Sequence, residues 1–238
     1  MSNIRIFVSH RIDIDSETVD TPVYFPVRCG AVYDEEGNSE IQGDDTGDNI
    51  SKLRMSFCEF TVQYWAWKNV DADYYGLCHY RRYLSFSDKR YKNTVFNMVR
   101  ELKLTPHEKK KYHLDDTKKI EKTVKQYDMI IPVVAKASEM SYNRAEVKTL
   151  REMWESYNGV YFEQGIIDKM FSLIKEYSPE YYNSACEYFS GKYHRAFNCY
   201  IMKKELFVRM CEFQFPIMKR ITEITDCKTY ERAPGYIG

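Results

Sequence analysis

The sequence predicts an α/β fold in which helices flank a mostly parallel central sheet. Short runs of β-branched and aromatic residues alternate with segments of helical periodicity, a pattern typical of parallel strands joined by helices. Polar clusters follow several predicted strands, at the edge where open α/β sheets bind ligands. No linker rich in Pro or Gly divides the 238 residues, so we expect a single domain, 1–238.

The first part of the chain supplies the strands that define this sheet. Ile4–Ser9 is an apolar run that predicts a strand buried on both faces, and it ends at His10 and Arg11. Val23–Val27 lies among prolines, which cannot donate a ladder hydrogen bond, so it is at most an edge strand or an extended segment. Asp73–Tyr80 predicts a central strand.

Helices and a polar insertion account for most of the rest. Met55–Lys68 has apolar residues at spacings of three and four, which predicts a helix capped by Asn49 or Ser51. Residues 87–125 are polar and rich in Lys, which predicts a helical insertion outside the core. Its lysines form a solvated face or contact an anionic membrane or polyanionic acceptor. Further predicted elements are strands Tyr127–Val134 and Tyr193–Met202, helices Asn143–Tyr157, Tyr161–Tyr177, Pro179–Ser190 and Lys204–Ile224, and a polar tail 225–238.

Composition excludes some classes of protein and partner. Lys+Arg and Asp+Glu are both 35, so the chain lacks the basic excess of a general nucleic-acid binder. The 21 tyrosines suit polar or sugar-like ligands, although packing is the commoner role of any single tyrosine. The first residues do not form a secretion signal, and no run is long enough to span a membrane, so a cytoplasmic location is expected. Seven cysteines without a CxxC pair fit reduced thiols.

The loop Gly43–Ser51 holds three carboxylates, Asp44, Asp45 and Asp48, between glycines. Such groups are costly to bury unless they meet a ligand or one another. They could bind sugar hydroxyls, act as a general base, pair with arginines, or offer oxygen ligands to Mg²⁺ or Mn²⁺. The alternative is a solvated loop with Asx turns. An EF-hand is excluded because Met55 stands where its bidentate Glu is needed.

A second cluster, Gly76–Tyr83, places His79, Arg81 and Arg82 at the end of the central strand. On an extended chain His79 and Arg81 share one face and Arg82 the other. Arginine suits bidentate contacts with phosphate, but pairing with the acidic loop is the alternative. The sequence has no Gly-rich phosphate motif, no HExxH and no zinc spacing.

His194 and Asn198 are weaker site candidates. They are four residues apart in the predicted strand Tyr193–Met202, so we expect them to share a face. A lone histidine in such a strand is more often a satisfied core residue than a catalyst.

These clusters resemble a bacterial family long catalogued as a domain of unknown function. That family occurs in capsule, exopolysaccharide and O-antigen gene clusters, and it is associated with galactofuranosyltransferase activity. The resemblance covers nearly the whole chain. The matching segments are the first strand up to His10, Val27–Ala31, Gly43–Ser51, Phe57–Glu59, Tyr64–Asn69, Gly76–Tyr83, and Asn198 with Ile201–Lys204.

The resemblance implies a GT-A-like fold and an inverting transferase that uses a nucleotide-sugar donor, UDP-galactofuranose. It also implies a lipid-linked glycan acceptor, other polysaccharide-assembly proteins as partners, and peripheral contact with the inner membrane face. Enzymes of this fold commonly hold the diphosphate through a metal on an Asp-x-Asp motif. His79, Tyr80, Arg81 and Arg82 occupy that place here, so we expect cationic side chains to replace the metal, and divalent cations are disfavoured.

Roles then follow from position at the strand ends. His79, Arg81 and Arg82 would hold the diphosphate, with His10 and Gly30 near the nucleotide. Donor or acceptor sugar would meet the loop that holds Asp44, Asp45, Asp48 and Asn49, with one aspartate as the base, and His194 and Asn198 would assist.

The end of the chain departs from the family pattern. Members usually continue past the motif at Gly235–Gly238 into a further helix, so we expect the chain to be truncated or to have lost that segment, which could carry the base. A non-catalytic nucleotide-sugar-binding module and a metal-dependent phosphate-ester hydrolase remain alternative functions.

Overall fold

The computed structural model describes residues 3–14, 16–35, 40–91, 94–95, 98–100, 104–161, 163–195 and 197–225. Contacts divide the chain into two compact units. Unit 1 comprises Met1–Arg54, Cys58–Val133 and Phe197–Arg209, and unit 2 comprises Met55–Phe57, Val134–Ala196 and Met210–Gly238. A single functional domain stays a prediction. The motif at the end of the chain lies outside the described residues.

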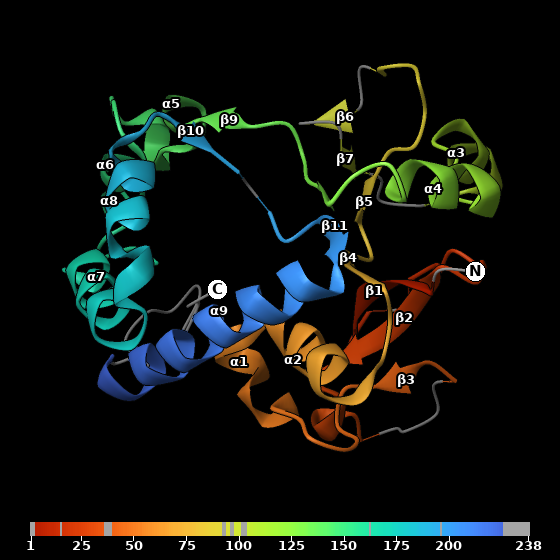
Figure 1. Ribbon diagram of the computed structural model, residues 1–238, viewed down its shortest axis with the longest axis horizontal. Coiled ribbons are helices and arrows are strands. Elements are labelled where there is room, and N and C mark those ends of the chain that lie inside the picture. The colour runs from red at the N-terminus through yellow and green to blue at the C-terminus, as the bar shows by residue number, and fades with distance from the viewer. Residues whose placement is uncertain are drawn as a thin grey trace. The chain divides into compact units, whose positions relative to one another are not determined.

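Unit 1 contains the predicted parallel sheet, and the α/β fold class is confirmed. Its parallel strands are β1 (Ile4–Arg11), β2 (Tyr24–Cys29), β3 (Gln42–Gly43) and β4 (Tyr74–His79), in the spatial order β3-β2-β1-β4 (Figure 1). Because all four run in one direction, their carboxyl ends lie at one edge of the sheet.

Antiparallel strands extend the sheet beyond β4. The end of β4 pairs with β5 (Arg82–Leu84), and its earlier part pairs with β11 (Tyr200–Lys203). β11 also pairs with β8 (Met129–Ile130), so the strand predicted over Tyr127–Val134 is shorter than expected. The outer strands are β7 (Met98–Arg100) and β6 (Thr94–Val95).

The prediction that the second strand is at most an edge strand was wrong. β2 lies between β1 and β3, and Pro26 pairs in register with Val8. β3 meets β2 only at Val27 and Arg28, after the proline. The missing N–H of Pro26 is therefore not needed for the outer ladder.

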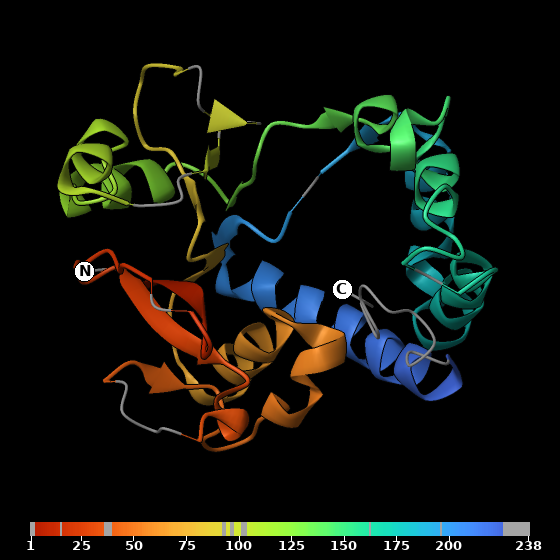
Figure 2. The same cartoon turned by 180° about the vertical axis from the view of Figure 1, so that it is seen from behind.

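One face of the sheet is covered by α2 (Phe60–Asn69) and by the first turn of α9 (Lys204–Ile224) (Figure 2). Phe7 of β1 contacts Trp65 of α2 with ring centroids 6.3 Å apart. Tyr75 of β4 stacks on Phe207 of α9 at 4.3 Å. Since side chains alternate along a strand, Phe7 and Tyr75 identify the residues that share this face.

The predicted helix Met55–Lys68 is broken. A 3₁₀ turn, Ser51–Leu53, leads into α1 (Arg54–Phe57), and the chain turns at Cys58 before α2 begins. Cys58 has φ 46° and ψ −128°, which is not helical, so periodicity alone missed the break.

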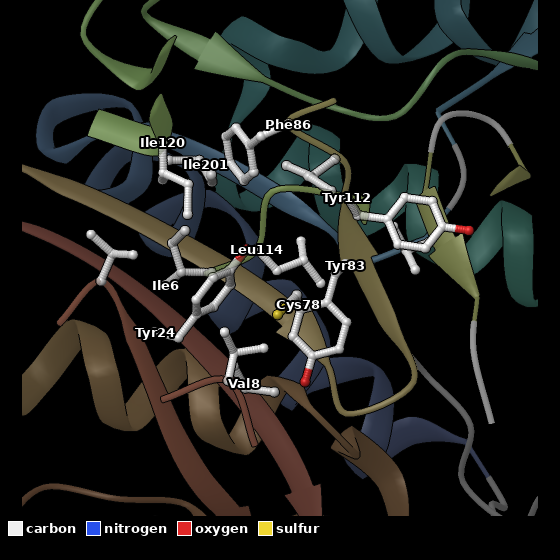
Figure 3. Close-up of a cluster of buried hydrophobic side chains, with 14 of the residues drawn as sticks. Ile6, Val8, Tyr24, Cys78, Tyr83, Phe86, Tyr112, Leu114, Ile120 and Ile201 are labelled. Carbon is white, nitrogen blue, oxygen red and sulfur yellow. The ribbon is translucent and has the colours of Figure 1, made fainter. Parts of the chain in front are cut away.

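The opposite face carries a core to which the polar insertion contributes, so its prediction as a segment outside the core was wrong. α3 (Pro106–Lys111) and α4 (Thr117–Val124) belong to this segment. Tyr112, Leu114 and Ile120 are fully buried, and they pack with Ile6 and Cys78 of the sheet (Figure 3). Their wide spacing among lysines hid this core from the sequence pattern.

Unit 2 is largely helical. Leu150 and Met153 of α6 form one small core, and Leu173 and Ile174 of α7 form another with the end of α9. Both helices are shorter than predicted. The elements are β9 (Ala135–Lys136), α5 (Ala137–Met140), α6 (Leu150–Glu155), α7 (Ile166–Tyr177), α8 (Tyr182–Ser190) and β10 (Tyr193–His194), which pairs with β9.

The late strand predicted over Tyr193–Met202 is two strands. β10 ends at His194 in unit 2, whereas β11 begins at Tyr200 in unit 1. His194 and Asn198 therefore do not share the face of one strand, contrary to the prediction. Among the helices within the described residues, none is long and apolar enough to cross a bilayer.

Candidate functional site

The candidate site lies in unit 1, at the carboxyl edge of the parallel strands. β1 ends with His10 and Arg11, β2 is followed by Gly30, β3 opens into the loop Gly43–Ser51, and β4 ends at His79. The register of the ladder places Ser9 beside His79 and His10 beside Arg28. The parallel strands thus bring together four segments that lie far apart in the sequence.

Asp44 is the buried anchor of the acidic loop, with 0% of its surface exposed. Its carboxylate accepts hydrogen bonds from the backbone N–H groups of Gly30 and Ala31, both at 2.9 Å. The hydroxyls of Ser51 and Thr61 each donate at 2.5 Å. Four donors satisfy this charge, so its geometry suits a scaffold that fixes the turn after β2 and does not suit a base that reaches substrate.

The other two aspartates are exposed. Asp48 accepts a hydrogen bond from the Tyr64 hydroxyl at 3.2 Å, and its backbone is held by both polar atoms of the Asn69 amide. Asn49 uses its amide inside the loop, where it donates to the carbonyl of Asp45 at 3.1 Å. The loop is thereby fixed to α2, and its outward carboxylates stay available to a polar ligand.

Gly30 positions an arginine that the sequence reasoning left out. Its φ of 71° is left-handed, and a Cβ there would come within 2.1 Å of the Cδ of Arg54. The guanidinium of Arg54 contacts Asp13 at 3.1 Å, and Asp13 also pairs with Arg11. The hydrogen bond from Arg11 lowers the pKa of Asp13 to about 2, so this carboxylate stays charged between two arginines.

The segment His79–Arg82 is a tight hairpin between β4 and β5. His79 pairs with Arg82, and residues directly opposite in an antiparallel pair share a face. His79 therefore faces the same side as Arg82 and not Arg81, which corrects the expectation for an extended chain. The guanidinium of Arg81 lies 4.9 Å from the Tyr80 ring, and that of Arg82 lies 4.7 Å from the Phe197 ring.

Two histidines at this edge are neutral near pH 7. Burial lowers the pKa of His10 to about 4. Burial, followed by the charges of Arg82 and Arg81, lowers the pKa of His79 to about 3. The Nδ1 atom of His10 is 2.6 Å from the Ser16 hydroxyl, whereas its buried Nε2 atom finds no hydrogen-bond partner within the described residues. The edge is therefore electropositive through arginines, with neutral imidazoles beside them.

Of the two weaker candidates, only Asn198 joins this edge. Asn198 lies two residues before Tyr200, which pairs with Leu77, and this antiparallel register brings it to the carboxyl end of β4. Its amide donates to the Glu59 carboxylate at 3.1 Å. His194 belongs to unit 2, where its Nδ1 atom lies 3.3 Å from the Tyr188 hydroxyl.

No group of three His, Cys, Asp or Glu side chains within the described ranges could hold a metal ion. Asp44, Asp45 and Asp48 lie close together in the sequence, but the carboxylate of Asp44 already accepts four hydrogen bonds from the protein. Metal independence stays a prediction, because the phosphate oxygens of a bound donor would add ligands of their own.

Two comparisons with known proteins bear on this site. Residues 5–238 match the family described as "Domain of unknown function (DUF4422)". The chain belongs to this family. It is also similar to the apo structure of the WbbM bifunctional glycosyltransferase, with 26% identity and a TM-score of 0.83. The match covers 99% of the present chain and 40% of the WbbM chain. The search of curated protein sequences gave no match to the present chain.

Sequence reasoning missed Arg11, Arg54 and Glu59 as site residues. Arg11 follows the first strand directly, so the rule that placed His10 there applies to it as well. Glu59 stands inside a matched family segment, but a predicted continuous helix gave it no special position. Nothing in the local pattern points to Arg54, because its place depends on the turn at Gly30.

Proposed function

We propose that this DUF4422 protein is an inverting glycosyltransferase that moves galactofuranose from UDP-galactofuranose to a hydroxyl of a lipid-linked surface-polysaccharide acceptor. The observation that carries the proposal is the convergence of arginines and neutral histidines at the carboxyl edge of the parallel sheet. The similarity to a glycosyltransferase supports the same reaction class. The sugar, the acceptor and the stereochemistry come from the family resemblance.

The diphosphate of the donor is best accommodated at the β4–β5 hairpin. Arg81 is exposed, and no carboxylate pairs with it among the described residues, so its planar fork can take two phosphate oxygens. Arg82 and His79 share a face beside it. A departing UDP carries extra negative charge, which these groups stabilise without proton transfer. In this proposal they do the work that a metal ion does in related folds.

The neutral state of His79 fits this assignment. Arg82 and Arg81 disfavour a third positive charge, and a neutral imidazole can still donate one hydrogen bond. We therefore expect His79 to stay neutral and to donate one hydrogen bond to a phosphate oxygen.

The sugar would lie toward the loop Gly43–Ser51. Asp45 and Asp48 are exposed there, and carboxylates are good acceptors for sugar hydroxyls. Asp44 serves this proposal indirectly, because it holds Gly30 and Ala31 in place and so fixes the turn against which the Arg54 side chain packs.

A donor screen tests the proposal. The full chain is incubated with UDP-galactofuranose, UDP-galactose or UDP-glucose and octyl β-galactoside as acceptor, once with EDTA and once with Mn²⁺. We expect transfer from UDP-galactofuranose that persists in EDTA. Activity that vanishes with EDTA and returns with Mn²⁺ would refute the proposal that side chains bind the diphosphate without a metal ion. UDP binding without any transfer would favour a non-catalytic module, and UDP-sugar cleavage at full rate without acceptor would favour a hydrolase.

A further inference from the structure

We infer that Glu59 is the general base that takes the proton of the acceptor hydroxyl. This inference rests on the proposed transferase function and deepens it, because the base is otherwise unassigned. Four observations on the described residues carry it: the place of Glu59 at the sheet edge, its partner, the strained backbone on both sides of the pair, and the lack of a paired cation.

The position of Glu59 follows from the start of α2. Glu59 is the N-cap residue of that helix, and α2 covers the face of the sheet that carries Phe7 and Tyr75. His79 lies two and four residues beyond Leu77 and Tyr75 in β4, so it points to this same face. Arg82 pairs with His79 across the hairpin, so Glu59, His79 and Arg82 share one side of the carboxyl edge.

Asn198 links the carboxylate to the hairpin. Its amide donates to Oε1 of Glu59 at 3.1 Å, which fixes the orientation of the carboxylate. The residue before it, Phe197, carries the guanidinium of Arg82 above its ring at 4.7 Å. Two consecutive residues, Phe197 and Asn198, therefore contact Arg82 and Glu59 respectively. They connect the proposed base to an arginine proposed to bind the diphosphate.

Both members of the pair follow a strained residue. Cys58 has φ 46° and precedes Glu59, and Phe197 has φ 72° and precedes Asn198. Residues without a glycine's freedom hold such angles only where the surroundings impose them, and such residues cluster at functional sites. The Cys58 carbonyl accepts hydrogen bonds from the Cys29 thiol and from the backbone N–H of Thr61, both at 3.1 Å.

The surroundings of Glu59 also suit a base. Its side chain is half-buried, and no Lys, Arg or His forms an ion pair with it within the described part of the chain. Asp44, by contrast, is enclosed by four donors. A carboxylate that accepts one neutral hydrogen bond keeps lone pairs for a proton, whereas one that is fully occupied does not.

The chemical step balances with the atoms present in donor and acceptor. Glu59 accepts the proton of the acceptor O–H as that oxygen forms a bond to the anomeric carbon. The bond from this carbon to the diphosphate oxygen breaks, and UDP leaves with the electron pair. The proton then passes from Glu59 to solvent, and the product has the inverted configuration.

The decisive experiment compares Glu59→Gln with Glu205→Gln, an exposed glutamate of α9 that serves as the matched control. Transfer from UDP-galactofuranose to octyl β-galactoside and the Kd for UDP are both measured. General-base catalysis contributes about 10²–10⁴-fold, so we expect kcat of Glu59→Gln to fall by that factor. The Kd for UDP should stay within about threefold, because the base does not bind the diphosphate. The control variant should match the wild type in both quantities.

Asn198→Ala separates positioning from packing. Asn198 is a positioning residue, so its loss should lower kcat about tenfold or more. In the double variant with Glu59→Gln it should cost little further, because the two act as one unit. If Glu59→Gln does not fold, Glu59→Asp keeps the charge and withdraws it by one methylene, and it should also lose kcat at unchanged Kd for UDP.

Three results would overturn the inference. Full kcat in Glu59→Gln or Glu59→Asp removes the base role while the transferase function stands. A tenfold or greater weakening of UDP binding makes Glu59 a donor ligand. A wild-type chain that neither binds UDP nor transfers sugar refutes the proposed function, and the role of Glu59 falls with it.

Discussion

The two polar segments of unit 1, the loop Gly43–Ser51 and the hairpin His79–Arg82, are built in opposite ways. In the loop, the central charge of Asp44 is buried and satisfied by four protein donors. In the hairpin, Arg81 is exposed, and its guanidinium lies over the ring of Tyr80. The buried carboxylate of Asp44 stabilises the loop itself, whereas the exposed guanidinium of Arg81 is available to a ligand.

This contrast separates support from function at one sheet edge. A charge enclosed by its own protein stabilises the fold and has little capacity left for substrate. A charge held by an aromatic face keeps its hydrogen-bond donors available. A dense cluster of charged residues in a sequence therefore does not by itself identify a ligand-binding site. The number of hydrogen bonds that each charged group already makes within the protein is more informative.

The largest expected effect is a loss of stability when the Asp44 carboxylate is removed. Asp44→Ala leaves the N–H groups of Gly30 and Ala31 without their acceptor. Losing several hydrogen bonds to one buried charge should lower the free energy of unfolding by about 3–5 kcal/mol. Urea denaturation followed by circular dichroism measures this, with Asp45→Ala as the exposed control, which should shift stability by less than about 0.5 kcal/mol. Equal effects in both variants would contradict the anchor role.

The next effect concerns pH and His10. Its pKa is about 4 in the folded chain against 6.5 in the unfolded chain, so its contribution to stability is complete above pH 6.5. Below that pH the unfolded chain binds a proton that the folded chain does not, and up to about 3 kcal/mol is lost as pH falls toward 4. Denaturation at pH 7, 5.5 and 4.5 should show a flatter pH dependence for His10→Asn than for wild type.

An exposed histidine, His107, provides the control for that series. His107→Asn should keep the slope of the wild type. A slope that is unchanged in His10→Asn would mean that its imidazole is solvated in the folded protein, and the edge would then have one neutral histidine fewer.

How far the sequence could predict this site depends on distance along the chain. His10, Gly30 and His79 follow strands directly, so the rule for parallel sheets is enough to place them at one edge. The face of Arg82 was predicted wrongly, because a two-residue turn is not visible in a run of polar residues. The burial of Asp44 was also hidden, because its donors come from turns whose geometry no periodic pattern encodes.

Tertiary packing explains the other failures. Tyr112, Leu114 and Ile120 are apolar residues scattered among lysines, and only the sheet face that they cover makes them core. Cys58 interrupts a sequence of good helical periodicity, because hydrogen bonds from the Cys29 thiol and the Thr61 backbone N–H hold its carbonyl in a non-helical turn. Local patterns predicted most helices and strands and the sheet edge that carries the site. Long-range contacts determine where the predicted helix breaks and which residues of the polar insertion are buried.

A third prediction tests the hairpin directly. Arg81→Ala should weaken UDP binding by about 1.5–3 kcal/mol, or about 10- to 150-fold, which is the cost of a lost hydrogen bond between charged groups. Arg81→Lys keeps the charge but loses the planar fork, so its affinity should fall between wild type and Arg81→Ala. Isothermal titration with UDP measures both, with Arg144→Ala, an exposed arginine of unit 2, as control.

Unchanged UDP affinity in Arg81→Ala would move the diphosphate away from the hairpin. The hairpin would then have no assigned ligand, although the stability difference between Asp44→Ala and Asp45→Ala would remain.

The smallest expected effect concerns Asp48, an exposed carboxylate of the same loop. Asp48 accepts one hydrogen bond, from the Tyr64 hydroxyl at 3.2 Å, and it is exposed. Asp48→Asn keeps an acceptor oxygen, so the free energy of unfolding should change by about 0.5–1 kcal/mol or less. Transfer should stay within about tenfold of wild type, since a sugar contact is weakened but the base is retained. A fall in kcat of about a hundredfold or more at unchanged UDP affinity would return the base to this loop, and Glu59 would then be left as a residue that orients Asn198.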